Sequence, residues 1–451
     1  MTTEIQTLFA KALHHQQQNE LAEAITLYEK LLLLSPQHVD ALHYLALALA
    51  QSGKMEKAIV CFKKALALHP LDERLHSNLA NAYKKAGQEQ EALNHYQKAL
   101  RINPDYAPAH HNLAVFFSAK EDHQKALHHY HAAVNAQPDF LAAHYHLGLL
   151  FFKQGQVDAA KKQFTNVLSL FPKHLDANFY LGIVHLEDNN LIEAKGYFEA
   201  VLSLDEEHAD ALINLGVIAL KQDKGQKAID HFTKALALNE HHVDARNNLA
   251  ATFMHYDRFE NALMHYDYLL KNEPDNFEYL YNAGVAEMAL GRLQEATQHF
   301  LQVLAQNDAH FAALTNMAAI YNRQEEYALA IDFLKRALLV KPDDEATRFM
   351  LQALTPDASH PAPCRDYVTN LFNNYALYYD KHMQETLNYT LPQHIAKVLH
   401  KHHYLHFNKT LDLGCGTGLS GVVLRELSEH LTGIDLAPKM LAHAREKDIY
   451  D

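Results

Sequence analysis

One position recurs every 34 residues along most of this 451-residue chain. A proline fills it in most repeats, and an acidic residue fills it in the others. The prolines are Pro36, Pro70, Pro104, Pro138, Pro172, Pro274 and Pro342, and the acidic residues are Glu206, Glu240 and Asp308. A strict period of this length is typical of a solenoid built from helix pairs, in which each pair buries its apolar face against its neighbours.

Two further positions of the repeat predict how the helices of a pair pack. In the first helix a leucine such as Leu45 precedes a small residue such as Ala46 or Gly216. In the second helix an alanine stands four residues before an aromatic ring, as in Ala228 and Phe232. Residues four apart share one helix face. Small residues there allow two helix backbones to approach closely while the larger side chains fill the space beside them.

This pattern resembles the tetratricopeptide repeat family. About ten repeats fit between residues 2 and 341, and residues 342–354 follow as a capping helix, which gives a predicted repeat domain over residues 1–354. The resemblance implies a mainly α fold, a right-handed α-α superhelix whose first helices line a concave face. The function expected of such a surface is binding of a protein or an extended peptide.

A row of asparagines in the first helices is not explained by packing. They directly precede the core leucine or its substitute, and they are Asn78, Asn112, Asn214, Asn248, Asn282 and Asn316. Asparagine is less favourable than alanine in a helix interior by about 0.5 kcal/mol. Because a carboxamide both donates and accepts hydrogen bonds, such a row can hold the backbone of an extended chain.

An acidic row lies four residues before the asparagines, on the same helix face. It comprises Asp40, Asp176, Asp210, Asp244 and Glu278. The two rows look similar to the asparagine and aspartate ladders in the repeat domain of O-GlcNAc transferases, which implies a peptide-binding groove. The alternative is that repeat duplication merely copied solvent-facing residues.

The 34-residue period stops at Leu354 and a different organisation follows. Residues 355–363 are rich in proline and predict a linker, and residues 367–399 predict short helices. A strand over 409–413 then leads into a glycine loop, a helix, and a second strand over 431–435 that ends in an acid. Glycines let the backbone approach a ligand, and an acid at a strand end can accept from both ribose hydroxyls.

The sequence LDLGCGTG resembles motif I of class I S-adenosylmethionine-dependent methyltransferases. The resemblance implies a partial Rossmann-like α/β domain over residues 364–451 that would use S-adenosylmethionine as its cofactor if the domain is completed. Asp412 matches the acid near the methionine amino group, and Asp435 matches the acid on the ribose. The glycines that would flank the methionine moiety are Gly414, Gly416 and Gly418.

Two alternatives to this match stay open. Gly416, Gly418 and Gly421 also fit the G-x-G-x-x-G fingerprint of nicotinamide dinucleotide enzymes, although Gly414 already occupies the place directly after the strand. An unrelated glycine turn is the other alternative. In predicted bacterial methyltransferases that carry tetratricopeptide repeats, the preceding helices cover the cofactor. Tyr375 and Tyr379 are therefore candidate contacts, with simple helix packing as the competing interpretation.

The sequence departs from the methyltransferase family in one respect. The family resemblance implies a seven-stranded sheet, whereas only two strands are predicted here. We therefore expect a fragment of a longer protein, a degenerate domain, or a domain completed by another chain, and we expect this chain to be inactive by itself. No catalytic residue and no methyl acceptor can be named. The two functional hypotheses are a methyltransferase whose repeats present the substrate, and a non-catalytic interaction scaffold.

Composition restricts the partners. The formal net charge of −14 argues against nucleic acid or an anionic membrane as a partner. The three cysteines are far apart, no secretory signal is recognised, and no apolar run is long enough to span a bilayer, which together predict a cytoplasmic protein. His402 and His406 stand four apart and would share a helix face as a possible metal pair, but no third ligand is evident, so no metal site is predicted.

Overall fold

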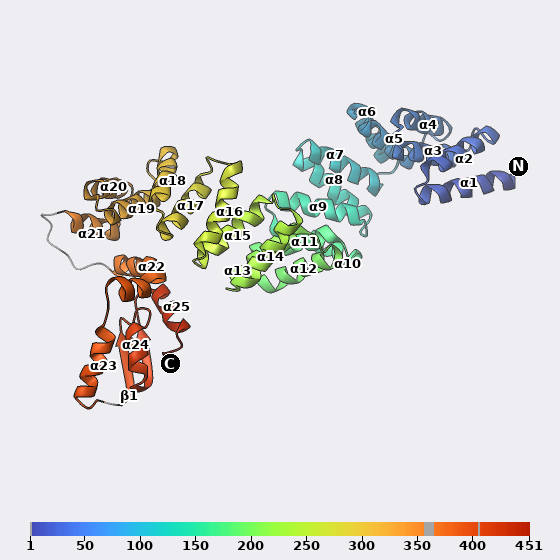
Figure 1. Ribbon diagram of the computed structural model, residues 1–451. Helices are drawn as coiled ribbons and strands as arrows, with labels where there is room; N and C mark the ends of the chain where they lie inside the picture. The colour runs from blue at the N-terminus through green and yellow to red at the C-terminus, as the bar shows by residue number, and fades with distance from the viewer. Residues whose placement is uncertain (1, 356–364, 405) are drawn as a thin grey trace. The chain divides into compact units, whose positions relative to one another are not determined.

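The computed structural model describes residues 2–355, 365–404 and 406–451. Figure 1 shows tandem helix pairs followed by a small α/β segment, which confirms the predicted fold class. The predicted linker over 355–363 lies outside the described residues apart from Thr355. The chain divides into two compact units, Met1–Asn214 and Leu215–Asp451, which we describe separately.

The first unit contains six complete helix pairs and the beginning of a seventh. Its helices are α1 (Thr2–Gln17), α2 (Leu21–Leu34), α3 (Val39–Gln51), α4 (Met55–Leu68), α5 (Glu73–Lys85), α6 (Glu89–Ile102), α7 (Ala107–Ala119), α8 (His123–Ala136), α9 (Leu141–Lys153), α10 (Val157–Leu170), α11 (Leu175–Glu187), α12 (Leu191–Leu204) and α13 (Ala209–Lys221), which crosses the unit boundary.

The second unit continues the pairs and ends them with a shorter helix. These helices are α14 (Gly225–Leu238), α15 (Val243–His255), α16 (Phe259–Asn272), α17 (Phe277–Ala289), α18 (Leu293–Gln306), α19 (Phe311–Arg323), α20 (Tyr327–Val340) and α21 (Glu345–Leu354). Met350, Leu351 and Leu354 of α21 pack against the core formed by the preceding pairs.

The core of the helix pairs forms where a small residue of the first helix meets an aromatic ring of the second, except in the α19–α20 pair, where Leu334 takes the place of the ring. The ring lies sixteen residues further along the chain, as in Gly182 and Phe198 or Gly284 and Phe300. Both rings are fully buried. A methyl group at Gly182 would come within 2.7 Å of Cε1 of Phe198, so the absence of a side chain is what lets the helices close.

A left-handed residue ends the first helix of every repeat. These residues have positive φ and follow the same 34-residue period: Asn19, Gly53, Gly87, Glu121, Gly155, Asn189, Asp223, Asp257, Gly291 and Glu325. The backbone N–H groups around them bond back to the last turn, as Lys54 N does to Leu49 O at 2.8 Å. This C-terminal cap turns the chain into the second helix.

The C-terminal segment combines helices with a two-stranded parallel sheet. Its elements are α22 (Arg365–Lys381), the π-helical turn η1 (His382–Thr386), α23 (Leu391–Lys401), β1 (Phe407–Leu413), α24 (Leu419–Arg425), β2 (Ser428–Ile434) and α25 (Pro438–Glu446). In the sheet Asp412 is opposite Gly433 and Leu413 is opposite Ile434.

Two local expectations need correction. Strand β2 begins at Ser428, three residues before the predicted start, because Ser428 pairs with Phe407 and its hydroxyl bonds Thr410. The polar residues at 428–430 hid this extension from the apolar pattern. His402 and His406 do not share a helix face either, since α23 ends at Lys401 and His403 has φ +63.

Candidate functional site

The carboxyl ends of β1 and β2 lie at the same edge of the sheet, where ligands bind in open parallel sheets. The glycine loop, residues 414–418, follows β1, and Asp435 follows β2. Gly414, Gly416 and Gly418 all have positive φ, at 74°, 54° and 86°. A methyl group at Gly414 would meet no atom within 4 Å, so the first part of the loop borders open space.

Asp435 joins the two strand ends through its carboxylate. Its Oδ2 accepts a hydrogen bond from Gly416 N at 2.9 Å, and its Oδ1 accepts one from Ala437 N at 2.8 Å. A carboxylate has about four acceptor positions, so two such bonds leave room for two more. The structure therefore brings together Asp435 and the glycine loop, which the sequence had predicted as parts of one site.

Asp412 is engaged from within the segment. Its Oδ2 accepts a hydrogen bond from the Tyr450 hydroxyl at 2.8 Å, and burial followed by this contact raises the pKa of Tyr450. The Tyr450 ring occupies the space that side chains at Gly421 and Gly433 would need. Sequence reasoning missed Tyr450, although the two glycines are a signal for a large neighbour.

One aromatic ring of helix α22, that of Tyr379, lies beside the glycine loop. A methyl group at Gly416 would lie 3.9 Å from Cε1 of Tyr379. Tyr375 contacts His382 and packs with Tyr379 against the buried side chains of Ala437 and Met440. Burial is the first cause of the raised pKa of both tyrosines. The structure thus places Tyr379 beside the loop and gives Tyr375 packing contacts.

Sequence reasoning also missed an ion-paired carboxylate at the end of α22. Asp380 accepts a hydrogen bond from the Thr417 hydroxyl of the glycine loop, and its second oxygen lies 2.5 Å from Lys447 Nζ. The partners are 37 and 67 residues away in the chain. No sequence pattern connects them.

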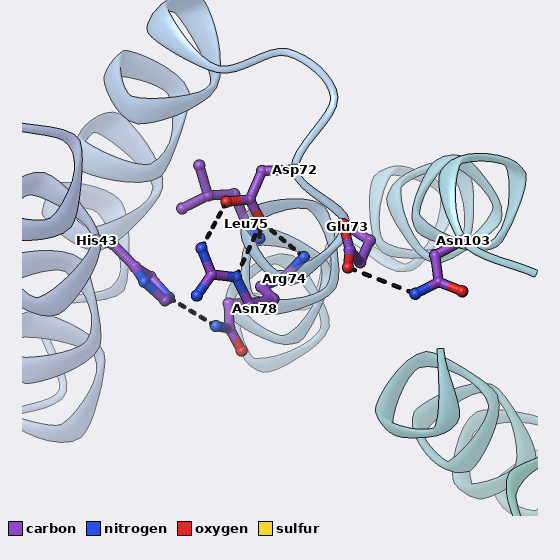
Figure 2. Close-up of polar contacts among 7 residues, drawn as sticks. All are labelled: His43, Asp72, Glu73, Arg74, Leu75, Asn78 and Asn103. Carbon is purple, nitrogen blue, oxygen red and sulfur yellow. Dashed lines mark hydrogen bonds and ion pairs between the residues drawn. The ribbon is translucent and has the colours of Figure 1, made fainter. Parts of the chain in front are cut away.

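The asparagine row in the first helices is half-buried throughout, whereas the acidic row beside it is exposed. The three asparagines of the row in the first unit all bond within the array, and Asn112 hydrogen-bonds the side chain of His111. Asn78 Nδ2 lies 2.8 Å from Nε2 of His43 in α3, as Figure 2 shows, and Asn214 Nδ2 donates to the Asp210 carbonyl oxygen at 2.8 Å. In the acidic row, Asp176 accepts a hydrogen bond from the Tyr145 hydroxyl.

In the second unit two asparagines of the row hydrogen-bond tyrosine hydroxyls. Asn282 hydrogen-bonds the hydroxyl of Tyr266, and Asn316 that of Tyr281. Burial raises the pKa of both tyrosines, so their hydroxyls stay neutral. Each amide keeps donor or acceptor capacity after one such bond. Intramolecular partners therefore account for part of the row, which neither sequence interpretation included, and they leave capacity for a ligand.

Comparisons with protein families match both parts of the chain. Models described as tetratricopeptide repeat or TPR repeat match residues 5–38, 46–87, 74–106, 95–128, 112–160, 147–194, 209–242, 257–309 and 313–347. A model described as methyltransferase domain matches residues 410–449, which include the glycine loop and Asp435. The chain is a tetratricopeptide-repeat protein with a C-terminal methyltransferase-like domain.

Solved structures resemble parts of the tetratricopeptide array. The structure described as YrrB, "a TPR protein with an unusual peptide-binding site", is 27% identical, with a TM-score of 0.38, covering 41% of this chain and 95% of that one. The structure of pilF from Pseudomonas aeruginosa is 20% identical, with a TM-score of 0.42, covering 46% of this chain and 95% of that one.

A third structure is the C-terminal part of a TPR repeat-containing protein from Cytophaga hutchinsonii. It is 18% identical, with a TM-score of 0.43, and the match covers 53% of this chain and 99% of that one. No curated protein matches the chain. Among the residues that the structure describes, none of the helices has the length and apolar character required to cross a membrane.

Proposed function

We propose that the methyltransferase-like domain binds S-adenosylmethionine at the edge formed by the glycine loop and Asp435, and that the tetratricopeptide array presents a protein substrate to it. The observation that carries this proposal is the pair of hydrogen bonds that the Asp435 carboxylate accepts from Gly416 N and Ala437 N. They fix an acid with spare acceptor positions beside a glycine loop whose first residue borders open space, as a ribose-binding acid requires.

The residues present fit the cofactor in charge and space. Asp435 would accept the ribose hydroxyls, and Gly414 and Gly416 would flank the methionine moiety because neither carries a side chain. Asp412 would lie near the positively charged amino group, with Tyr450 holding its carboxylate in place. Tyr379, over Gly416, would exclude water from one side. The cofactor supplies a methyl group bound to a positively charged sulfur, and this charge makes the methyl carbon an electrophile.

Calorimetric titration with S-adenosylmethionine tests this proposal, both on the chain and on a form in which further strands complete the domain. We expect saturable binding that Asp435→Ala and Gly416→Val abolish, the first by removing the acceptors and the second by placing a branched side chain at positive φ. Glu429→Ala is the control, because this exposed acid lies at the start of β2, at the opposite end of the strand from Asp435. Equal binding by all three variants would contradict the assignment of the site.

The same titration distinguishes the alternatives. Binding of a nicotinamide dinucleotide in place of S-adenosylmethionine would favour the dehydrogenase fingerprint. Failure of both ligands, with each variant folded, would favour the non-catalytic scaffold.

The thiols of Cys61 and Cys415 are free. They support a reducing compartment such as the cytoplasm as the place where the protein acts.

The second candidate function, peptide binding by the tetratricopeptide array, rests on the first helices. In the second unit, Asn248, Asn282 and Asn316 are half-buried, and the exposed acids Asp244 and Glu278 stand four residues before two of them. Amides that can bond a peptide backbone beside carboxylates favour an extended, polar or basic peptide. A peptide-array screen with the whole chain tests this preference, and exclusive capture of acidic peptides would contradict it.

A further inference from the structure

The side chain of Thr417 attaches the glycine loop to helix α22. Thr417 lies in the loop between two residues of positive φ and is 1% exposed. Its hydroxyl does not cap the following helix, because the N-cap of α24 is Gly418 and no side chain caps it. The hydroxyl bonds instead to Oδ1 of Asp380 in the last turn of α22.

The second oxygen of Asp380 brings in a third element. It lies 2.5 Å from Nζ of Lys447, the residue directly after α25. One carboxylate therefore joins α22, the glycine loop and the end of α25. The side chains of Asp380 and Lys447 are 36% and 27% exposed. An ion pair at this exposure adds little to global stability, so the consequence of the contact lies in where it holds the loop.

A second attachment lies two helical turns earlier on α22. Oδ1 of Asn373 accepts a hydrogen bond from Lys439 N at 3.0 Å, at the start of α25. Residues seven apart lie on the same face of a helix. Asn373 and Asp380 therefore fix both the rotation of α22 about its axis and its position along that axis relative to α25. Ala376, on the same face between them, is buried against Ala437 and Met440.

This geometry determines the position of Tyr379, the neighbour of Asp380. We propose that Asp380 is a positioning residue that holds α22 against the glycine loop through Thr417 and Lys447, so that Tyr379 forms one wall of the cofactor site over Gly416. The inference rests on the proposed function for its role in binding. The attachment itself rests only on the contacts of Asp380.

Hydrogen–deuterium exchange tests the attachment without any cofactor. In the full chain, Asp380→Ala should increase the exchange rate of the amides in residues 414–419 several-fold, because the loop loses its bond to α22. Asp380→Asn keeps an acceptor for Thr417 and should show a smaller increase. Lys447→Met keeps the Thr417 bond and should resemble Asp380→Asn. Asp366→Ala, which removes an exposed acid in the first turn of the same helix, should match the parent.

Titration with S-adenosylmethionine tests the consequence for binding. We expect the affinity to fall several-fold in Asp380→Ala, to recover in part in Asp380→Asn, and to be unchanged in Asp366→Ala. Parent-like exchange in a folded Asp380→Ala overturns the inference. Parent-like affinity in that variant also overturns it while leaving the proposed function intact. If the parent ignores the cofactor but the exchange pattern holds, the attachment stands and the proposed function fails.

Discussion

Gly216 in α13 lies so close to Phe232 in α14 that a methyl group on it would approach Cε1 of the ring to 2.5 Å. The ring cannot move aside easily because Phe232 is fully buried. The equivalent position is alanine in other repeats, for example Ala250 opposite the buried ring of Tyr266. Each small residue is therefore matched to the spacing of its own helix pair.

Gly216→Ala should lower the free energy of unfolding by about 1–3 kcal/mol, because it overpacks this contact. The matched control is Gly196→Ala in α12, where a methyl group would meet no atom within 4 Å and the position is exposed. That change should raise stability by up to about 1 kcal/mol, since alanine is the better helix former. Thermal or urea unfolding of the two variants checks the opposite signs.

The buried histidine pairs should make the array less stable in acid. Nδ1 of His110 lies 3.0 Å from Nδ1 of His129, and Nε2 of His110 donates to the Pro104 carbonyl oxygen at 2.8 Å. Burial, helped by His110 and His128, lowers the pKa of His129 to about 4. In the unfolded chain His129 takes up a proton near pH 6.5, whereas in the folded chain it does so only near pH 4. The contribution of the neutral His129 to the free energy of unfolding is therefore fully present above about pH 6.5 and is lost as the pH falls to about 4.

His129→Gln tests this pH dependence, because the next repeat already pairs His144 with Gln163 at 2.7 Å. We expect the melting temperature of this variant to fall less than that of the parent between pH about 7.5 and about 5. His299→Gln is the control of opposite sign, since its hydrogen bond to Glu287 raises the pKa of His299. The stabilisation by the His299–Glu287 bond is present in acid, and it is lost as the pH rises through the raised pKa of His299. Identical pH profiles for all three proteins would contradict the assignment.

A histidine caps the N-terminus of several first helices. Nδ1 of His174 accepts a hydrogen bond from Ala177 N at 3.2 Å, whereas the same slot holds Asp72 in another repeat. Each of these side chains satisfies a backbone N–H group that has no partner within the helix. His174→Asp should keep the cap and a stability close to that of the parent, whereas His174→Ala should lose about 0.5–2 kcal/mol. Urea unfolding of the parent and the two variants measures the difference, and a parent-like His174→Ala would contradict the role of the cap.

Replacing Asn248, Asn282 and Asn316 together with alanine should weaken binding of a peptide found by the array screen. Each lost hydrogen bond contributes about 0.5–1.5 kcal/mol. The control is the double change of Asn261 and Asn272 to alanine, because both are exposed on the second helix α16. Titration after checking that each variant is folded measures the effect. Unchanged affinity in the triple variant would show that these amides do not bind the peptide.

The repeat period alone was enough to predict the helix pairs, because the packing within a pair depends on residues that are close in sequence and recur every 34 residues. A small residue, an aromatic ring and a proline at fixed spacing suffice to predict which face of each helix is buried, as Ala228 and Phe232 show. The order of strand, glycine loop, helix and strand followed from residue types in the same way. The family matches confirm both parts, and the roles of the individual site residues stay predictions.

Tertiary packing decided what lies beside the glycine loop. Asp380 and Thr417 are 37 residues apart, Asn373 and Lys439 are 66 apart, and Tyr450 and Asp412 are 38 apart. No periodicity connects such residues, because their contacts depend on how α22 and the last residues fold over the sheet edge. The partners of the asparagine amides were hidden for a related reason. A repeat period predicts that equivalent residues share a face, whereas side-chain packing selects which neighbour each amide bonds.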